Sequence, residues 1–310
     1  MIIVAGENVV DLIPAGDGPA LGDGGPGPSV AGGLLRAALG GGPANTAVAA
    51  ARLGAPVAFA ARFGHDAPGR AFRDRMGDAG VDLRYAVDLP NPSAMALATI
   101  DETGAATYDF WLDNAADFTA TPLPAPGDGD IQHIGSLAAY WPPGADMIEQ
   151  WIDRSRATVT LDVNLRPIVL ASQPDAVARL DRLVRRVDVV KASDDDLRMA
   201  YPLVEPETTA RAWLDQAGCS LVVLTLGARG AVALTRDGAR VEMPAPGVTV
   251  VDTIGAGDAA MGALLSRIAA DGLDGILGDL DGTLRFVVTV AALACTRAGA
   301  YAPATDELVG

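Results

Sequence analysis

Residues 248–270 read VTVVDTIGAGDAAMGALLSRIAA and combine three signals in a row. The β-branched run 248–251 predicts a buried strand. The glycines of the following GAG triplet allow a tight turn. Apolar residues at i, i+3, i+4 and i+7 from Met261 then mark one face of a helix, which we expect to end near Gly272. We therefore predict a strand that leads through a glycine turn into a helix.

The turn before this helix favours the binding of an anion. Gly255, Ala256 and Gly257 can present backbone N–H groups and the positive end of the helix to one spot, which suits a phosphate or a developing negative charge. Asp258 follows in the first helical turn. A carboxylate beside such an anion hole can accept the proton of an alcohol that attacks a phosphoryl group. A simple helix cap is the alternative role for Asp258.

The composition excludes several classes of protein. Half of the residues are hydrophobic, which supports a large core, and the net charge of −16 argues against nucleic-acid partners and anionic membranes. No apolar run is long enough for a membrane span, and the early acids Glu7 and Asp11 indicate a first strand and not a signal peptide. Cys219 and Cys295 suggest neither a disulfide framework nor a metal site. We expect a cytoplasmic protein.

The order of the predicted elements indicates an α/β fold. From residue 131 onwards strands and helices alternate, which predicts one doubly wound, mostly parallel sheet in a single domain, residues 1–310. The Gly/Pro-rich segment 14–33 and a hairpin over 95–110 are expected to form a small β-sheet lid, about residues 11–35 and 85–113. Such a lid would exclude water from a phosphoryl transfer.

Two early segments carry candidate ligand-binding residues. Asp11 follows the first strand, where open α/β sheets bind ligands, although a turn acid is the alternative. Gly40 and Gly41 bring backbone N–H groups close to a ligand. Asn45 can both donate and accept, as a hydroxyl-rich molecule requires, and its alternative role is the N-cap of a helix over 46–53.

Further polar residues follow later strands. Asp162, Asn164 and Arg166 lie two apart and would share one face if the strand stays extended, which favours a site over a core. Ser193 can cap the next helix, whereas Asp196 can hold water on Mg²⁺. The stretch LVVLTLGARG, residues 221–230, predicts a strand and a second glycine turn suited to an anion.

Together these motifs resemble the ribokinase-like (phosphofructokinase-B-type) family of carbohydrate kinases, and among them the fructokinase-like members. The resemblance covers nearly the whole chain in the same order. Its most specific motif is Asp-Thr-x-Gly-Ala-Gly-Asp, from Asp252 to Asp258. The other motifs are Gly40-Gly41 to Asn45, Asp162-x-Asn164-x-Arg166, Lys191-Ala192-Ser193 to Asp196, Thr225-Leu226-Gly227-x-x-Gly230, and Cys295-Thr296-Arg297-Ala298-Gly299-Ala300.

The resemblance implies a three-layer α/β/α fold with a β-sheet lid that joins a homodimer. It also implies ATP, Mg²⁺ and transfer of the γ-phosphoryl group to a sugar hydroxyl, which makes the chain a phosphotransferase with an alcohol acceptor. A catalytically inactive sugar-binding module is the alternative from another class. The intact acid and anion-hole turn argue against that alternative.

The resemblance further implies a role for each matching residue. Asp258 would be the base, and the anion hole would consist of Gly255, Ala256 and Gly257. The sugar would be bound by Asp11, Gly40, Gly41, Asn45 and Arg166. The residues for the nucleotide would be Asn164, Lys191, Ser193, Thr225, Gly227, Gly230 and Cys295. Asp196 would hold Mg²⁺ through water, and carbonyls near Asp252, Ile254 and Gly299 resemble a loop for a monovalent cation such as K⁺.

Three positions depart from the family pattern. Asp196 stands where Glu is usual, and Ala260 replaces a usual Phe after the catalytic acid. Leu112 occupies a place where fructokinase-like and ketodeoxygluconate kinase-like members often carry Arg, which a sugar acid would need for its carboxylate. We therefore expect fructose as the acceptor. The alternatives are 2-keto-3-deoxygluconate and a nucleoside, whose base could stack on Tyr108 or Trp111.

Overall fold

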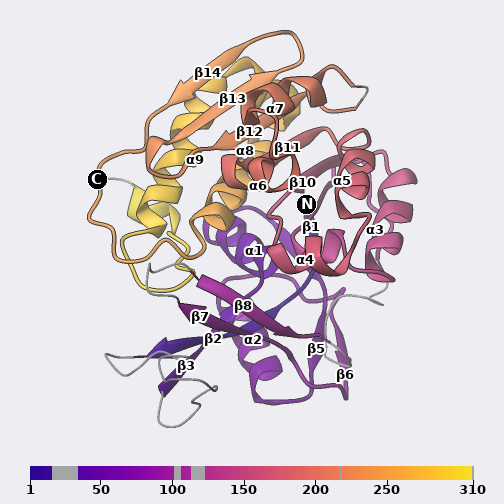
Figure 1. The fold of residues 1–310 in the computed structure, drawn as a ribbon, viewed down its shortest axis with the longest axis vertical. Coiled ribbons are helices and arrows are strands. Elements are labelled where there is room, and N and C mark those ends of the chain that lie inside the picture. Colours follow the sequence, from indigo (N-terminus) through magenta and orange to yellow (C-terminus); the bar gives the residue numbers. More distant parts are fainter. Residues whose placement is uncertain (16–33, 101–105, 113–122, 217, 309–310) are drawn as a thin grey trace.

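A large, mostly parallel sheet forms the centre of the computed structural model, which describes residues 1–15, 34–100, 106–112, 123–216 and 218–308 (Figure 1). Within these residues the sheet has eight strands in the order β14-β13-β12-β11-β10-β9-β1-β4. Neighbours from β4 to β12 are parallel, and β13 and β14 are antiparallel. Their bounds are β1 (Ile2–Ala5), β4 (Val57–Ala60), β9 (Ile131–Gly135), β10 (Thr158–Asp162), β11 (Val189–Ser193), β12 (Leu221–Thr225), β13 (Ala231–Thr235) and β14 (Arg240–Met243).

Helices cover both faces of this sheet, because alternate residues of its strands enter two separate cores. Ile2 and Val4 belong to one core, and Ile3 and Ala5 belong to the other. The first core is covered by α1 (Gly42–Arg52), α2 (Ala67–Asp78), α8 (Ala256–Gly278) and α9 (Leu280–Ala294). The second is covered by α3 (Gly144–Asp153), α4 (Pro167–Ser172), α5 (Ala176–Val184), α6 (Asp194–Ala200) and α7 (Pro206–Leu214). The predicted three-layer α/β/α fold is confirmed.

A smaller sheet lies at one end of the molecule (Figure 1). Among the described residues it has four strands in the order β3-β2-β7-β8, and β7 and β8 form the predicted hairpin. Segments 16–33, 101–105 and 113 of the predicted lid lie outside the described residues. The strands at this end are β2 (Val9–Ala15), β3 (Leu34–Gly40), β7 (Ala94–Ile100) and β8 (Ala106–Trp111), with a separate pair, β5 (Arg62–Gly64) and β6 (Val87–Leu89).

The predicted buried strand at 248–251 is wrong. The chain leaves the sheet after β14, and Val250 and Val251 are 59% and 60% exposed. Pro244 and Pro246 follow β14 and cannot donate to a sheet ladder. The N–H of Val251 instead donates to the carbonyl of Cys295, at 2.8 Å. The glycine turn and the helix after it form as predicted, and the left-handed φ of Gly272 breaks the helix where the sequence indicated.

Some helices begin earlier than their apolar patterns indicated. α1 starts at Gly42 and not at residue 46, with Pro43 in its first turn, where the missing N–H of proline costs nothing. Asn45 therefore lies inside the helix, and its alternative role as an N-cap is wrong, since Gly41 is the N-cap. The apolar run of α9 begins at Phe286, but the helix starts at Leu280, because the Asp279 side chain accepts from the N–H of Gly282.

The contact between α1 and α8 predicts a difference between two glycine substitutions. A Cβ on Gly262 of α8 would lie 2.5 Å from Cβ of Ala49 and 2.9 Å from the backbone nitrogen of Ala50. Gly262→Ala should therefore lower the free energy of unfolding by roughly 1–3 kcal/mol. Gly77 of α2 meets nothing within 4 Å, so Gly77→Ala should raise that free energy by about 0.4–1 kcal/mol. Urea unfolding measures both values. A Gly262→Ala protein as stable as the wild type would contradict this close contact.

Candidate active site

The start of α8 depends on a glycine. Gly255 is its N-cap, with φ 78° and ψ 0° in the left-handed region. A Cβ at this position would also lie 2.8 Å from Cα and Cβ of Ala300. The N–H of Ala256 donates to the carbonyl of Thr253, at 3.2 Å. The next amides of a helix have no partner inside that helix and face the space before it. The turn thus has the geometry of a site for negative charge.

Asp258 lies in the first turn of α8 and is 8% exposed. Its Oδ2 accepts from Nδ2 of Asn45 on α1, at 2.8 Å. Its Oδ1 accepts from Nδ2 of Asn164, which follows β10, at 3.4 Å. The carboxylate therefore faces side chains of other elements, so the structure does not support its alternative role as a cap of its own helix. Asn45 and Asn164 are neutral donors, so the Asp258 carboxylate stays able to accept a proton.

The small sheet brings another acid toward Asp258. Asp11 lies in β2, and a Cβ on Gly40 of β3 would come to 2.0 Å from its Oδ2, so only glycine leaves room for this carboxylate. Burial raises the pKa of Asp11 to about 6, while the charge of Arg166 opposes the rise and that of Asp258 adds to it. The charges of Arg166 and Asp258 therefore both act on Asp11. The structure brings together predicted sugar-binding residues from β2 and β3 and from the segment after β10.

The three polar residues after β10 do not share one face. The strand ends at Asp162, and Asn164 has a φ of 36°, which turns the chain. As a result Asp162 faces Lys191, Asn164 faces Asp258, and Arg166 occupies the N-cap position of α4. The three residues would share one face only if the strand stayed extended, and it does not. Asn164 and Arg166 nevertheless reach the site, because the turn directs them there separately.

Lys191 approaches the site from beneath the turn. Its ammonium is within 2.9 Å of both carboxylate oxygens of Asp162, and both residues are almost fully buried. A Cβ on Gly257 would lie 3.2 Å from Nζ, which places the ammonium under the helix start. Burial favours a neutral amine, but the charge and hydrogen bond of Asp162, together with the charges of Asp196 and Asp258, raise the pKa of Lys191. If Lys191 binds the nucleotide, as the resemblance implies, it does so as a buried ammonium that Asp162 holds in place.

The acidic run after β11 forms a helix cap. Oγ of Ser193 accepts from the N–H of Asp196, at 3.0 Å, and Oδ2 of Asp196 accepts from the N–H of Ser193, at 2.8 Å. This confirms the capping role of Ser193. Oδ1 of Asp196 also accepts from the N–H of Leu165, at 2.8 Å. A role of Asp196 in holding Mg²⁺ through water stays a prediction.

Asp252 joins the residues of the predicted cation loop. Its Oδ1 accepts from the N–H of Ile254, at 3.0 Å, and its Oδ2 accepts from the N–H of Gly299, at 2.7 Å. No group of three His, Cys, Asp or Glu residues that could hold a metal occurs in the described part of the chain. A site built from backbone carbonyls, or a Mg²⁺ ion that keeps its waters, does not require such a group.

The other predicted nucleotide residues, Thr225, Gly227, Gly230 and Cys295, lie around the ends of β12 and α9. Gly227 and Gly230 have φ values of 58° and 97°, and a Cβ on Gly230 would come to 2.0 Å from the carbonyl oxygen of Met243. Oγ1 of Thr225 donates to the carbonyl of Ala192, at 3.4 Å. Cys295 is partly buried at the end of α9. The glycine turn after β12 forms as predicted, and its contact with a nucleotide is untested.

Sequence reasoning missed two charged residues of the site, Glu7 and Arg75. Glu7 follows β1 and is 2% exposed, and its Oε2 accepts from the N–H of Ala138, at 3.0 Å. Burial raises the pKa of Glu7 to about 7, and hydrogen bonding from Ser136 and the charge of Arg166 oppose the rise. Glu7 is an acid within an apolar N-terminal stretch, and this sequence feature could have indicated a buried functional residue. Arg75 gave no signal, because it lies among the polar residues of α2.

Comparison with known proteins extends to the whole chain. The family model of the pfkB family carbohydrate kinases matches residues 1–307. The fructokinase of Rhizobium leguminosarum bv. trifolii is 33% identical over 278 residues, which cover 88% of this chain and 81% of that protein. The fructokinase of Klebsiella pneumoniae is 31% identical over 99% of this chain and 97% of that protein.

Solved structures show the same likeness. The fructokinase from Vibrio cholerae O395 with fructose, ADP and calcium ion bound has a TM-score of 0.84 and 29% identity, over 99% of this chain and 97% of that chain. The aminoimidazole riboside kinase from Salmonella enterica, complexed with aminoimidazole riboside and an ATP analog, has a TM-score of 0.83 and 27% identity, over 99% and 98%. None of the helices in the described ranges is long and apolar enough to cross a membrane. This chain belongs to the pfkB family of carbohydrate kinases and is a sugar phosphotransferase.

Proposed function

We propose that this chain is an ATP-dependent fructokinase, which transfers the γ-phosphoryl group of ATP to a hydroxyl group of fructose. The observation that carries the proposal is the buried Asp258 at the glycine turn that starts α8, with amides on both of its oxygens. The charges of Asp258 and Arg166 both act on Asp11. The fructokinase relatives from Rhizobium leguminosarum and Klebsiella pneumoniae support the same sugar.

In this proposal Asp258 is the general base. Its carboxylate accepts the proton of the sugar hydroxyl, and the hydroxyl oxygen forms a bond to the γ-phosphorus as the bond to the bridging oxygen of ADP breaks. Amides of the turn Gly255, Ala256 and Gly257 stabilise the negative charge on the transferred group. The ammonium of Lys191 adds a fixed positive charge beneath this turn.

The residues around the site suit a nucleotide with its metal. Asn164 and Arg166 would serve phosphates, and the glycine turn with Gly227 and Gly230 would line the nucleotide. When bound, Mg²⁺ would neutralise phosphate charge, with Asp196 acting through a water molecule. Asp252 ties Ile254 to Gly299, which supports the proposed K⁺ loop.

The acceptor follows from the residues around Asp11. A carboxylate accepts hydrogen bonds from two hydroxyls, as a neutral sugar offers. Leu112 packs against the apolar core, so this position supplies no cation for a sugar acid. A nucleoside is the second candidate, because its base could stack on Tyr108 of β8, on which the charges of Asp11 and Arg166 act. The likeness to an aminoimidazole riboside kinase supports this second candidate.

We also propose that the chain is cytoplasmic and that it forms a homodimer through the small sheet. Several large apolar side chains of this sheet are exposed, and exposed apolar surface is typical of protein interfaces. They are Leu34 (75%), Leu35 (41%), Met95 (37%), Tyr108 (38%) and Trp111 (50%). The two cysteines are free, which agrees with a reducing compartment. Light scattering of the wild type and of Trp111→Ser tests the dimer.

A coupled assay of ADP release across a panel of acceptors tests the substrate. Fructose should give the highest kcat/KM among fructose, 2-keto-3-deoxygluconate, ribose, adenosine and aminoimidazole riboside. Preference for a riboside would replace fructose with the second candidate. Absence of ADP release with every acceptor, together with a thermal shift on adding a sugar, would indicate an inactive binding module.

Replacing the base should abolish most of the activity. Asp258→Asn keeps the size of the side chain but cannot take up the proton, so kcat should fall by roughly 10²- to 10⁴-fold. The coupled assay measures kcat, and a thermal shift with fructose checks that binding persists. Wild-type activity in this variant would rule out Asp258 as the base.

The raised pKa of Asp11 predicts how sugar binding depends on pH. Its pKa of about 6 means that the carboxylate is charged above this pH and neutral below it. The KM for fructose should therefore rise by about tenfold between roughly pH 7 and pH 5, as the group gains its proton. Asp11→Asn should have a high KM throughout this range with little pH dependence. An unchanged pH profile of KM in this variant would contradict a role of Asp11 in sugar binding.

A further inference from the structure

Arg75 joins several parts of the fold beside Asp258. Its side chain is partly buried on α2, and Nη1 donates to the carbonyl of Leu39 in β3, at 2.8 Å. Nη2 donates to Oδ1 of Asn45, at 2.9 Å, and to the carbonyl of Ala300, at 3.3 Å. Asn45 in turn donates to Asp258, at 2.8 Å. A continuous path of hydrogen bonds therefore runs from α2 through α1 to the start of α8.

The chemistry of the amide lets Arg75 set the orientation of Asn45. An asparagine amide has a donor side and an acceptor side. If the amide turned over, its oxygen would face the carboxylate of Asp258 and its NH₂ would face the guanidinium of Arg75. Both contacts would then be repulsive. Because Arg remains charged at working pH, it holds the donor side of Asn45 toward Asp258.

We propose that Arg75 is a positioning residue for phosphoryl transfer, which through Asn45 fixes the direction in which the Asp258 carboxylate accepts a proton. This inference rests on the proposed function. The guanidinium also holds Leu39, which precedes Gly40 of the sugar site, and Ala300, against which Gly255 packs. Burial lowers the pKa of Arg75, and the charge of Asp258 opposes this, so the two charges interact across the amide.

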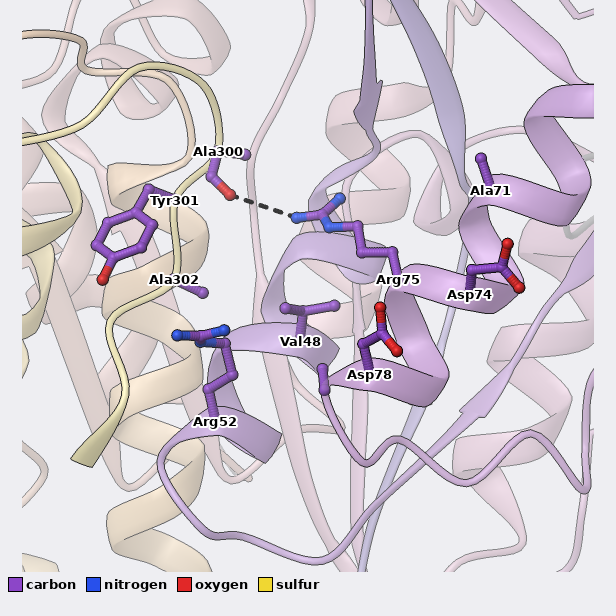
Figure 2. A pocket seen from close by; sticks show the side chains of 10 residues that line it. Val48, Arg52, Ala71, Asp74, Arg75, Asp78, Ala300, Tyr301 and Ala302 are labelled. Atoms are coloured by element: carbon purple, nitrogen blue, oxygen red, sulfur yellow. Dashed lines mark hydrogen bonds between the residues drawn. The ribbon is translucent and has the colours of Figure 1, made fainter. Parts of the chain in front are cut away.

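A cavity of about 480 Å³ beside Arg75 makes this role accessible to experiment. Figure 2 shows the Arg75 side chain at its wall, pointing to the carbonyl of Ala300. Asp74 and Asp78 of the same helix also line the cavity. Removal of the Arg75 side chain would extend the space toward Asn45, and the two carboxylates would attract a small cation. A free guanidinium ion can therefore enter and donate to Asn45 in place of the missing side chain.

The test is chemical rescue. In Arg75→Ala, kcat for sugar phosphorylation should fall by roughly 10- to 100-fold, as when an orienting hydrogen-bond partner is removed. Millimolar guanidinium chloride, below the concentrations that unfold proteins, should restore part of this loss. It should not raise the kcat of the wild type or of the matched control Arg70→Ala. Arg70 lies on the same helix with its side chain exposed and donates to the carbonyl of His65, at 3.3 Å.

Arg75→Lys covers the case in which the alanine variant does not fold. Lysine keeps the charge but lacks the fork that reaches both Asn45 and Leu39, so kcat should be intermediate with little change in the KM for ATP. Wild-type kcat in Arg75→Lys and Arg75→Ala would overturn the proposal. A folded Arg75→Ala protein whose lost activity guanidinium does not restore would also overturn it.

A second readout separates failure of the inference from failure of the proposed function. A wild-type chain that phosphorylates no sugar would contradict the proposed function. The side-chain NH₂ resonance of Asn45, measured by NMR, then still tests the inference. This resonance should shift and lose protection from exchange in Arg75→Lys and stay unchanged in Arg70→Ala. An unchanged resonance in Arg75→Lys would overturn the proposed orientation of Asn45.

Discussion

The hydrogen bond between Asn45 and Asp258 joins residues 213 positions apart and links the two halves of the site. It can form only because α1 and α8 lie very close together. Small residues such as Ala49 and Gly262 make this approach possible, since a side chain on Gly262 would meet the backbone of α1. The packing of two helices thus sets the position of one carboxylate. A change in that packing would alter the distance between Asn45 and the carboxylate.

Charge is balanced locally around this carboxylate. The chain has a net charge of −16, which would repel ATP if the charge were spread evenly over the site. Instead, Arg166 acts on both Asp11 and Glu7, and Lys191 neutralises Asp162 beneath the glycine turn. The positive end of α8 adds a further attraction for anions. An acidic protein can therefore contain a site that suits a highly charged nucleotide.

The sequence predicted the features that depend on local chemistry. A glycine turn that leads into a helix is recognisable because Gly255 must adopt a positive φ and the apolar spacing after it has a helical period. The strand predicted at 248–251 failed because a β-branched run looks the same whether it pairs in a sheet or lies on the surface. The two prolines after β14 were the feature that distinguished these cases.

The rest of the site depends on contacts between distant segments. The direction of Asn164 follows from a turned backbone, which its sequence spacing from Asp162 does not reveal. Arg75 looks like any arginine on a polar helix face, and its function is visible only once α2 lies beside Asn45 and Ala300. Glu7 is similar, since its partner Ala138 belongs to a segment 131 residues away. Motifs can therefore identify the groups that react, whereas the groups that orient them require the assembled fold.

Glycines at the site stand where an added side chain would meet other groups. Gly40 leaves space for the Asp11 carboxylate, Gly255 lets the turn pass Ala300, and Gly257 lies over the ammonium of Lys191. At each of these positions an added methyl group would meet a functional group or the backbone of another element. The geometry around Asp258 thus depends on the absence of side chains at these glycines as much as on the acids and amides themselves. Because such close approaches cannot relax independently, movement of β3, of the loop at Ala300 or of α1 would be transmitted to Asp258.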